Sequence, residues 1–489
     1  MQHHLNWING AAQPAESGDL LDSFDPATGE PWAQVVRSGR ADVEAAVAAA
    51  AAAFPGWRRT GPTARAAILW KLGDLIGEHA AELAALEARD AGKVIRETTG
   101  QLTGLRNWYH YYASLAYRLE GTTIPHDSPT LKISTVREPY GVIAVVPAFN
   151  SPMLLGSMGF APALAAGNTV VVKPPEVNAG ALSLLGALAK EAGLPDGCFN
   201  VVNGFGHEAG DLLVGHPNVR KVVFTGGPES GKAVARRCAD GLKPLVLELG
   251  GKSANMVFGD VNVPNVVNGI IAGIFAAAGQ TCVAGSRLVV HRSIAAELTD
   301  RIADRAGQIR LGNPLDAETE MGPLSQTKIL DGVVQRVSEA VAQGATIRAG
   351  GPSGQRPDRG WYYPPTVLDG VTNDMSIAQN ELFGPVLAVI PFDDDDEALA
   401  MANDSPFALA AGIWTNDVRR AHRIAHEVDA GTVWVNTYRA LNFAVPFGGR
   451  KLSGYGRENG LEGLLEFTQS KGIWFETDTA PVGDPFVLR

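Results

Sequence analysis

Short apolar runs and longer mixed stretches alternate along the middle of the chain. Four apolar runs predict buried strands, at 142–146, 169–173, 199–202 and 222–225. Each is followed by a stretch whose apolar spacing predicts a helix, near 152–165, 179–191, 207–214 and 229–240. Because strands that alternate with helices favour a parallel, doubly wound sheet, the pattern predicts an α/β fold. A second alternating region runs from about residue 265 to 435.

The segments before this region carry other patterns. Residues 42–59 and 62–92 have helical periodicity, and the Ala-rich part of the first is built from good helix formers. Residues 131–137 alternate like a strand, with turns expected at Gly121 and Pro125.

The size and charge of the chain narrow its class. Its 489 residues exceed what one compact core usually holds, so we expect two or three domains. A formal net charge of −11 argues against a surface for nucleic acid or an anionic membrane. The apolar stretch 153–166 is too short to span a bilayer, and residues 1–9 lack the pattern of a secretory signal. We therefore expect a soluble, cytoplasmic protein.

The three cysteines are Cys198, Cys238 and Cys282. A small, odd number suits a reducing compartment and gives no disulfide framework. No spacing of His, Cys, Asp or Glu predicts a metal site. Cys198 and Cys238 have no distinctive setting, and we interpret both as structural.

Cys282 stands apart because it ends the segment Gly279-Gln280-Thr281-Cys282. Small neighbours allow backbone and substrate to approach the sulfur, and a thiolate attacks carbonyl carbon readily. Glu248 lies 34 residues earlier, in Leu247-Glu248-Leu249-Gly250-Gly251-Lys252, where it could activate water. A lone cysteine is more often a buried, inert hydrophobe, but the flanks of Glu248 are not those of a solvated helix. Together the segments favour a catalytic pair.

These two segments resemble the signature motifs of the aldehyde dehydrogenase superfamily, whose members oxidise aldehydes to acids with NAD(P). Similar segments run in family order from about residue 6 to about 475. The resemblance implies two Rossmann-like doubly wound α/β domains plus a small β oligomerisation element. The cofactor domain would hold 1–118 and 140–250, the catalytic domain 251–465, and the oligomerisation element 119–139 and 466–489. A homodimer or homotetramer is implied.

The resemblance also implies a dinucleotide site. Gly226, Gly227 and Gly231 open a helix after a strand, and such a helix N-terminus can face a pyrophosphate. A structural turn would explain these glycines equally well. The family commonly has serine where this chain has Gly227, so fewer phosphate contacts are expected there.

Two further segments are implied to hold the cofactor. Lys173 and Glu176 would contact the adenosine ribose, and because a carboxylate repels a 2′-phosphate, we expect NAD rather than NADP; the alternative is a solvated ion pair. Glu381 would hold the nicotinamide ribose with Phe383 beside the ring, although Phe383 taken alone reads as a core residue. The remaining residues implied to bind cofactor are Phe149, Leu249 and Gly250.

The family mechanism assigns a role to each catalytic residue. Cys282 would attack the aldehyde, and the Asn150 amide with the Cys282 backbone N–H would stabilise the oxyanion. After hydride loss, Glu248 would activate the water that hydrolyses the thioester. The cysteine needs a lowered pKa, usually from a helix end or a cation, and the sequence does not identify which.

The substrate pocket is likewise implied by the resemblance. Its expected lining is Leu105, Trp108, Leu154, Met158, Ala276, Thr281, Val283, Leu441 and Phe447. Several family members have aromatic residues where this chain has Ser151, Ala276 and Leu441, so we expect a wider tunnel and a bulky or ring-bearing aldehyde. Arg439 is expected near the tunnel mouth, where it would bind the carboxylate of a semialdehyde or else face solvent.

Two alternatives remain open from the sequence. A CoA-acylating semialdehyde dehydrogenase would resolve the thioester with CoA, but such members usually lack the glutamate found at 248. A catalytically silent protein on the same scaffold is disfavoured by the joint presence of Cys282, Glu248 and Asn150. No catalytic group is assigned to the glycine-rich segment 446–454.

Overall fold

The computed structural model describes residues 1–487 and contains four β-sheets, two of them large and mostly parallel. Residues 488–489, which end the predicted oligomerisation element, lie outside the described residues. The first large sheet has the order β20-β12-β11-β8-β9-β10-β2-β3. Its strands are β20 (Gly454–Tyr455), β12 (Leu245–Glu248), β11 (Val219–Thr225), β8 (Val142–Val146), β9 (Thr169–Val172), β10 (Phe199–Val201), β2 (Asn6–Ile8) and β3 (Ala11–Gln13).

The five central strands of this sheet are parallel and follow a doubly wound order. Along the chain they come as β8, β9, β10, β11 and β12, so the winding reverses between β8 and β11. The parallel sheet predicted from the four apolar runs is therefore confirmed. Ligands in such sheets bind outside the carboxyl ends of the strands at this reversal.

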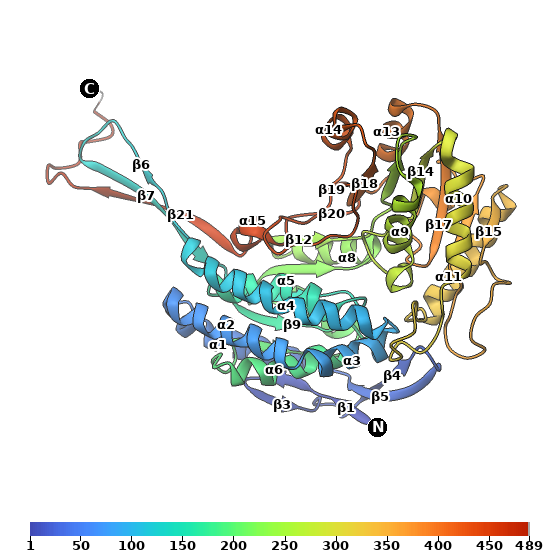
Figure 1. Ribbon diagram of the computed structural model, residues 1–489. Coiled ribbons are helices and arrows are strands. Elements are labelled where there is room, and N and C mark those ends of the chain that lie inside the picture. The colour runs from blue at the N-terminus through green and yellow to red at the C-terminus, as the bar shows by residue number, and fades with distance from the viewer. Residues whose placement is uncertain (488–489) are drawn as a thin grey trace.

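The second large sheet has the order β15-β16-β17-β14-β13-β18-β19 and is parallel apart from β15 at its edge. Its strands are β15 (Thr346–Ala349), β16 (Thr366–Asp369), β17 (Val386–Phe392), β14 (Arg287–His291), β13 (Ala254–Val257), β18 (Ala410–Trp414) and β19 (Thr432–Val435). This sheet lies beside the first and, together with its helices, forms the right-hand part of the molecule in Figure 1.

Helices fill the layers around both sheets (Figure 1). Those of the first half are α1 (Arg40–Trp57), α2 (Pro62–Glu78), α3 (Ala80–Ala91), α4 (Ile95–Leu115), α5 (Pro152–Ala165), α6 (Gly180–Glu191), α7 (Asp211–Gly215) and α8 (Pro228–Ala239). Those of the second half are α9 (Val263–Ile274), α10 (Arg292–Gly307), α11 (Thr327–Ala342), α12 (Ser376–Gln379), α13 (Asp395–Asn403), α14 (Val418–Glu427) and α15 (Gly460–Leu465).

The helix boundaries differ from the sequence prediction at two places. The stretch 62–92 forms two helices, because the chain leaves helical geometry at His79 before α3 begins. The helix expected at 207–214 starts as a π-helix over Gly206–Gly210 and only then becomes α7. Helix α5 matches its predicted bounds, begins with Pro152 at its first turn and is almost wholly buried between the first sheet and α4.

Two small sheets complete the fold. One joins β1 (Gln2–His4), β5 (Glu30–Val36) and β4 (Leu20–Asp25). The other joins β6 (Thr123–Ile124), β7 (Leu131–Pro139) and β21 (Thr468–Glu476), with β21 antiparallel to β7 over nine residue pairs. The sheet of β6, β7 and β21 is an arm that projects from the body of the molecule in Figure 1. Trp474 and Phe475 on it are both 61% exposed.

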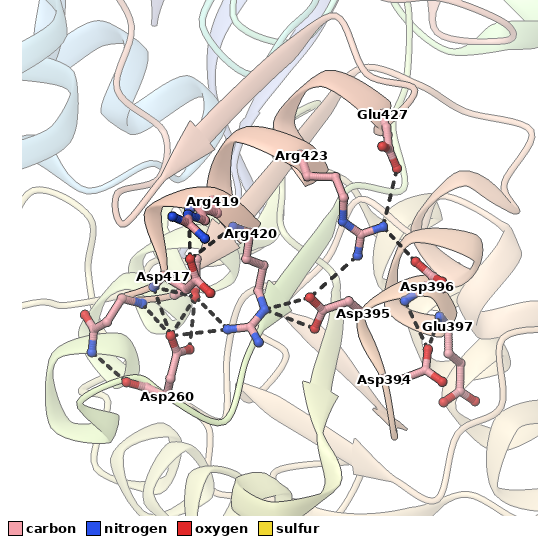
Figure 2. A network of polar contacts seen from close by, with 12 residues as sticks. Asp260, Asp394, Asp395, Asp396, Glu397, Asp417, Arg419, Arg420, Arg423 and Glu427 are labelled. Atoms are coloured by element: carbon pink, nitrogen blue, oxygen red, sulfur yellow. Dashed lines mark hydrogen bonds and ion pairs between the residues drawn. The ribbon is translucent and has the colours of Figure 1, made fainter.

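In the second large sheet, an ion-pair network joins the end of β13 to helices α13 and α14 (Figure 2). Arg420 of α14 lies between Asp395, at 2.8 Å, and Asp260, at 3.3 Å. Arg423 pairs with Asp396 at 2.7 Å. Protein donors satisfy the Asp260 carboxylate, which accepts from Thr415 and from the backbone N–H of Asp417. The network therefore joins the end of β13 to α13 and α14.

Two classes of feature are not found in the described chain. No helix within residues 1–487 is both long and apolar enough to cross a membrane. Over the same residues, His, Cys, Asp and Glu side chains do not gather in threes as a metal site would require.

Arg287 on β14 supports a stability prediction. Its side chain is 1% exposed and donates to the carbonyls of Lys252, Met401 and Ala402 at 2.7–2.9 Å. Arg287→Met would leave these buried acceptors unpaired, so we expect the free energy of unfolding to fall by about 3 kcal/mol or more, measured by urea denaturation. Arg292→Met, which removes an exposed ion pair with Asp393, should leave the midpoint nearly unchanged. Equal effects of the two substitutions would contradict this assignment.

Candidate active site

A cleft of about 890 Å³ opens at the carboxyl ends of β8, β9, β11 and β12, where the winding of the first sheet reverses. Residues from the second half of the chain close its other side. The predicted catalytic and cofactor residues that line it are Phe149, Asn150, Lys173, Glu176, Gly226, Gly227, Glu248, Leu249, Gly250, Cys282, Glu381 and Phe383. The fold thus brings together side chains that are more than 200 residues apart in sequence.

Three different elements deliver the predicted catalytic residues. Asn150 follows β8, Glu248 ends β12, and Cys282 follows a tight turn after α9. The Asn150 amide Nδ2 donates to the backbone carbonyl of Gln280 at 3.1 Å, which links the Asn150 loop to the cysteine loop. Neither carboxyl oxygen of the buried Glu248 finds a hydrogen-bond partner in the described part of the chain.

The charge around Cys282 differs from the sequence expectation. Burial, with smaller contributions from the carboxylates of Glu381 and Glu248, raises the pKa of the Cys282 thiol to about 12. The anticipated lowering of this pKa by a helix end or cation is therefore absent from residues 1–487. An anionic sulfur here requires a positive charge brought by a ligand or removal of the proton to a base.

The pKa of Glu248 is raised as well. Burial raises its pKa well above the usual value, and the nearby Glu458 carboxylate raises it again. Glu458 is buried too, and its pKa is raised to about 8. Glu458 was not expected from the sequence, because a carboxylate just after the glycine-rich segment 446–454 has no local signature that separates it from a solvated one.

The turn before Cys282 is strained. Ala277, Ala278 and Gly279 have φ of 53°, 52° and 71°, so three successive residues adopt the left-handed conformation. For each alanine this conformation costs on the order of 1–2 kcal/mol. The side chain of Gln280 is fixed next to the turn, since its Oε1 accepts from the backbone N–H and the hydroxyl of Ser325 at 3.0 Å.

The glycines before α8 serve two purposes. Gly227 precedes the first turn of α8, and within the described structure a Cβ added there would meet nothing within 4 Å. Its backbone is therefore open to the cleft. Gly231 is buried instead, because a Cβ there would come within 2.6 Å of the Leu249 side chain. Gly231 is not part of the cleft lining found here; it allows α8 to pack closely on the segment after β12.

The lysine and glutamate after β9 form a buried pair. Lys173 is 2% exposed and lies 3.3 Å from Glu176, whose other oxygen accepts the Gly206 N–H at 2.7 Å. Burial opposes ionisation of Glu176, but the charge of Lys173 and the Gly206 N–H lower its pKa overall. The alternative of a solvated ion pair is therefore wrong for Lys173.

The second cofactor segment lies across the cleft. Glu381 accepts the Gly251 N–H at 3.0 Å, and a Cβ at Gly250 would come within 2.0 Å of the Glu381 carboxylate. Phe383 and Phe149 meet edge to face, with ring centroids 5.6 Å apart. Because Phe383 lines the cleft, the reading that makes it only a core residue is not supported.

The expected substrate residues lie outside the lining of this cleft. Six of them are buried in one apolar cluster against which Cys282 packs, namely Leu105, Trp108, Leu154, Met158, Val283 and Phe447. Ala276 and Thr281 are half-buried, and Leu441 is 41% exposed. In the described structure none of these nine residues lines the 890 Å³ cleft.

Two details of this region bear on the expected wide tunnel. Ser151 is buried, and its hydroxyl accepts a hydrogen bond from Lys93 Nζ at 2.7 Å, so Lys93 occupies the space beside it. Arg439 is half-buried and donates to the carbonyl of Ala272 at 2.9 Å. Neither Lys93 nor its partner Gln101 was expected from the sequence.

Known proteins resemble the chain over its whole length. The model of the aldehyde dehydrogenase family matches residues 13–473. A (Z)-2-((N-methylformamido)methylene)-5-hydroxybutyrolactone dehydrogenase from Acinetobacter baylyi is 44% identical over 100% of both chains. Human retinal dehydrogenase 2 is 39% identical over 96% of this chain and 90% of the relative.

Solved structures give the same result. The NAD⁺ complex of an aldehyde dehydrogenase from Bacillus cereus superposes with a TM-score of 0.95 at 39% identity, covering 98% of this chain and 97% of the other. The aldehyde-dehydrogenase-like α/β fold expected from the sequence is thereby confirmed. The chain belongs to the aldehyde dehydrogenase family.

Proposed function

We propose that this protein oxidises an aldehyde to the carboxylic acid with NAD as hydride acceptor. The observation that carries the proposal is the convergence of Cys282, Asn150 and Glu248 on one cleft. A nucleophile, an oxyanion donor and a base are the groups that a hydrolytic aldehyde dehydrogenase requires.

The residues suit successive roles at one carbon atom. After the Cys282 thiol has lost its proton to a base, the thiolate bonds to the aldehyde carbon to give the thiohemiacetal oxyanion, which Asn150 and the Cys282 N–H stabilise. Loss of hydride from that carbon leaves a thioester on Cys282. Glu248 then takes a proton from water, the hydroxyl adds to the thioester carbon, and the acid and the thiol are released.

The cleft suits a nicotinamide dinucleotide. Gly226 and the open backbone of Gly227 lie at the N-terminus of α8, the Lys173–Glu176 pair follows β9, and Glu381 and Phe383 line the same cleft as Cys282. When bound, the cofactor accepts the hydride and brings the positive ring charge that Cys282 otherwise lacks. NAD complexes of related enzymes support this assignment, and the carboxylate of Glu176 favours NAD over NADP.

The substrate class follows from the relatives and from Arg439. A 5-hydroxybutyrolactone, as in the name of the 44%-identical relative, is the ring-closed form of an aldehyde that carries a carboxylate. We propose that the substrate is either a semialdehyde, which carries a carboxylate, or a bulky or ring-bearing aldehyde. Arg439, half-buried on the chain segment that follows β19, is the candidate for binding its carboxylate.

Two alternative functions, CoA-dependent acylation and a catalytically silent scaffold, are less well supported by the cleft. Retention of Glu248 in the cleft argues against CoA as the acyl acceptor, and the three converging groups argue against a silent scaffold.

We propose that the arm of β6, β7 and β21 joins copies of the chain into a dimer or tetramer, since it exposes Trp474 and Phe475. The proposed domains remain 1–118 with 140–250, 251–465, and 119–139 with 466–489.

A panel of aldehydes tests the proposed function. We expect NADH formation, without CoA, from aliphatic, aromatic and carboxylate-bearing aldehydes, with the highest kcat/KM for the carboxylate-bearing members. Cys282→Ala should lower the rate by at least about 1,000-fold, because no thioester can form. Turnover only after addition of CoA would favour the acylating alternative, and NAD binding with no turnover in either case would favour a silent protein.

The pH profile tests the coupling of the two buried carboxyl groups. In Glu458→Gln the charge that raises the pKa of Glu248 is gone, so that pKa falls and more Glu248 is ionised at a given pH. The acidic limb of the kcat profile should therefore move to lower pH. Glu462→Gln, on the exposed side of α15, is the control and should leave the profile in place. An unmoved limb in Glu458→Gln, or a shift to higher pH, would contradict the coupling.

A further inference from the structure

The first turn of α4 touches both loops that carry the proposed catalytic groups. Lys93 stands just before this helix, and its Nζ donates to Ser151 Oγ at 2.7 Å and to Gln101 Oε1 at 2.5 Å. Glu97, within the first turn, accepts the backbone N–H of Ala277 through Oε1 at 3.2 Å. One contact thus reaches the residue after Asn150, and the other reaches the strained turn before Cys282.

Each contact supplies a hydrogen-bond partner to one of the loops. The Ala277 N–H belongs to the left-handed turn, and Glu97 supplies an acceptor for it. Ser151 Oγ lies 2.6 Å from the Asn150 carbonyl, so the ammonium of Lys93 fixes the hydroxyl that holds the Asn150 backbone. The loops meet directly where Asn150 Nδ2 donates to the Gln280 carbonyl.

Hydrogen bonds to distant segments anchor helix α4. The backbone N–H of Ile95, its first residue, donates to the Pro314 carbonyl at 2.7 Å, which anchors α4 to the second half of the chain. Further along, Trp108 Nε1 donates to Asn459 Oδ1 at 2.9 Å, next to Glu458. Lys93 is buried, and the other oxygen of Glu97 is buried with no hydrogen-bond partner among residues 1–487.

We propose that Glu97 and Lys93 are positioning residues that hold the Ala277–Gly279 turn and the Asn150–Ser151 loop in register, so that the Cys282 sulfur and the Asn150 amide meet at the carbon and the oxygen of one substrate carbonyl group. This role rests on the proposed aldehyde oxidation. Neither side chain touches the substrate; both act through the loops. Misplacing a reacting group by about 1 Å costs on the order of a hundredfold in rate, so the contacts should influence kcat far more than binding.

Glu97→Ala is the main test, measured as kcat, KM and NAD dissociation constant. We expect kcat to fall about 10- to 100-fold, while KM and the dissociation constant change less than about threefold. Glu97→Gln keeps an oxygen that can accept the Ala277 N–H, so it should stay within about threefold of the wild type. Glu82→Ala on the exposed face of α3 is the matched control and should match the wild type.

A rescue experiment separates positioning from a general structural role. Glycine adopts the left-handed conformation without the strain of a Cβ. Ala277→Gly introduced into Glu97→Ala should therefore raise kcat at least about fivefold above the single variant. Lys93→Met, which keeps the volume but removes the donor, should lower kcat about tenfold without lowering the protection of the 276–280 amides.

Hydrogen exchange supplies a readout that needs no turnover. In Glu97→Ala the amides of residues 276–280 should exchange at least about tenfold faster than in the wild type, and Glu97→Gln should restore their protection. A wild-type kcat in Glu97→Ala, unchanged exchange, or equal loss in the glycine double variant would overturn the role of Glu97. Wild-type kcat in Lys93→Met would overturn the role of Lys93. If the wild-type protein itself shows no turnover, the proposed function is contradicted instead. Hydrogen exchange needs no turnover, so it still tests the positioning role and distinguishes that failure from a failure of the proposed function.

Discussion

The order of the parallel strands decides where a site can form in this molecule. Because the winding reverses between β8 and β11, the loops after these strands diverge and leave a cleft at their carboxyl ends. Asn150, the glycines before α8 and Glu248 all lie at or just after these strand ends and line the cleft. The second sheet then needs only to present Cys282 and Glu381 against it.

The cleft holds its reactive groups in an unfavourable state. Glu248 and Glu458 are buried close to each other, and burial together with nearby carboxylates raises the pKa of the Cys282 thiol. The left-handed turn at Ala277–Gly279 adds backbone strain. Such costs are tolerated where the surrounding contacts hold the geometry in place, as Ser325 does for Gln280 and Glu97 does for Ala277. A cationic ligand in the cleft would relieve part of the electrostatic cost.

The sequence predicted the central strands and helix α5 well, because buried parallel strands are continuous apolar runs and α5 begins at a proline. The resemblance of short motifs identified the residues that line the cleft. It could not identify Glu458, Lys93 or Glu97, since a charged residue carries no local mark of burial and each acquires its role from a distant segment. Gly231 shows the reverse case: its motif suggested a ligand contact, but its lack of a side chain serves packing against Leu249. The role of Ser151 also depended on tertiary structure, because Lys93 fills the space that a small side chain seemed to leave open.

The covalent intermediate on Cys282 is the central claim, and mass spectrometry of Glu248→Gln tests it most directly. The variant should take up one acyl group per chain when mixed with NAD and an aldehyde, since without the glutamate water attacks the thioester slowly. The account predicts a mass gain equal to the aldehyde less two hydrogens, located on the peptide that contains Cys282, together with one equivalent of NADH. NADH formation with no adduct, or an adduct on Cys198 or Cys238, would contradict it.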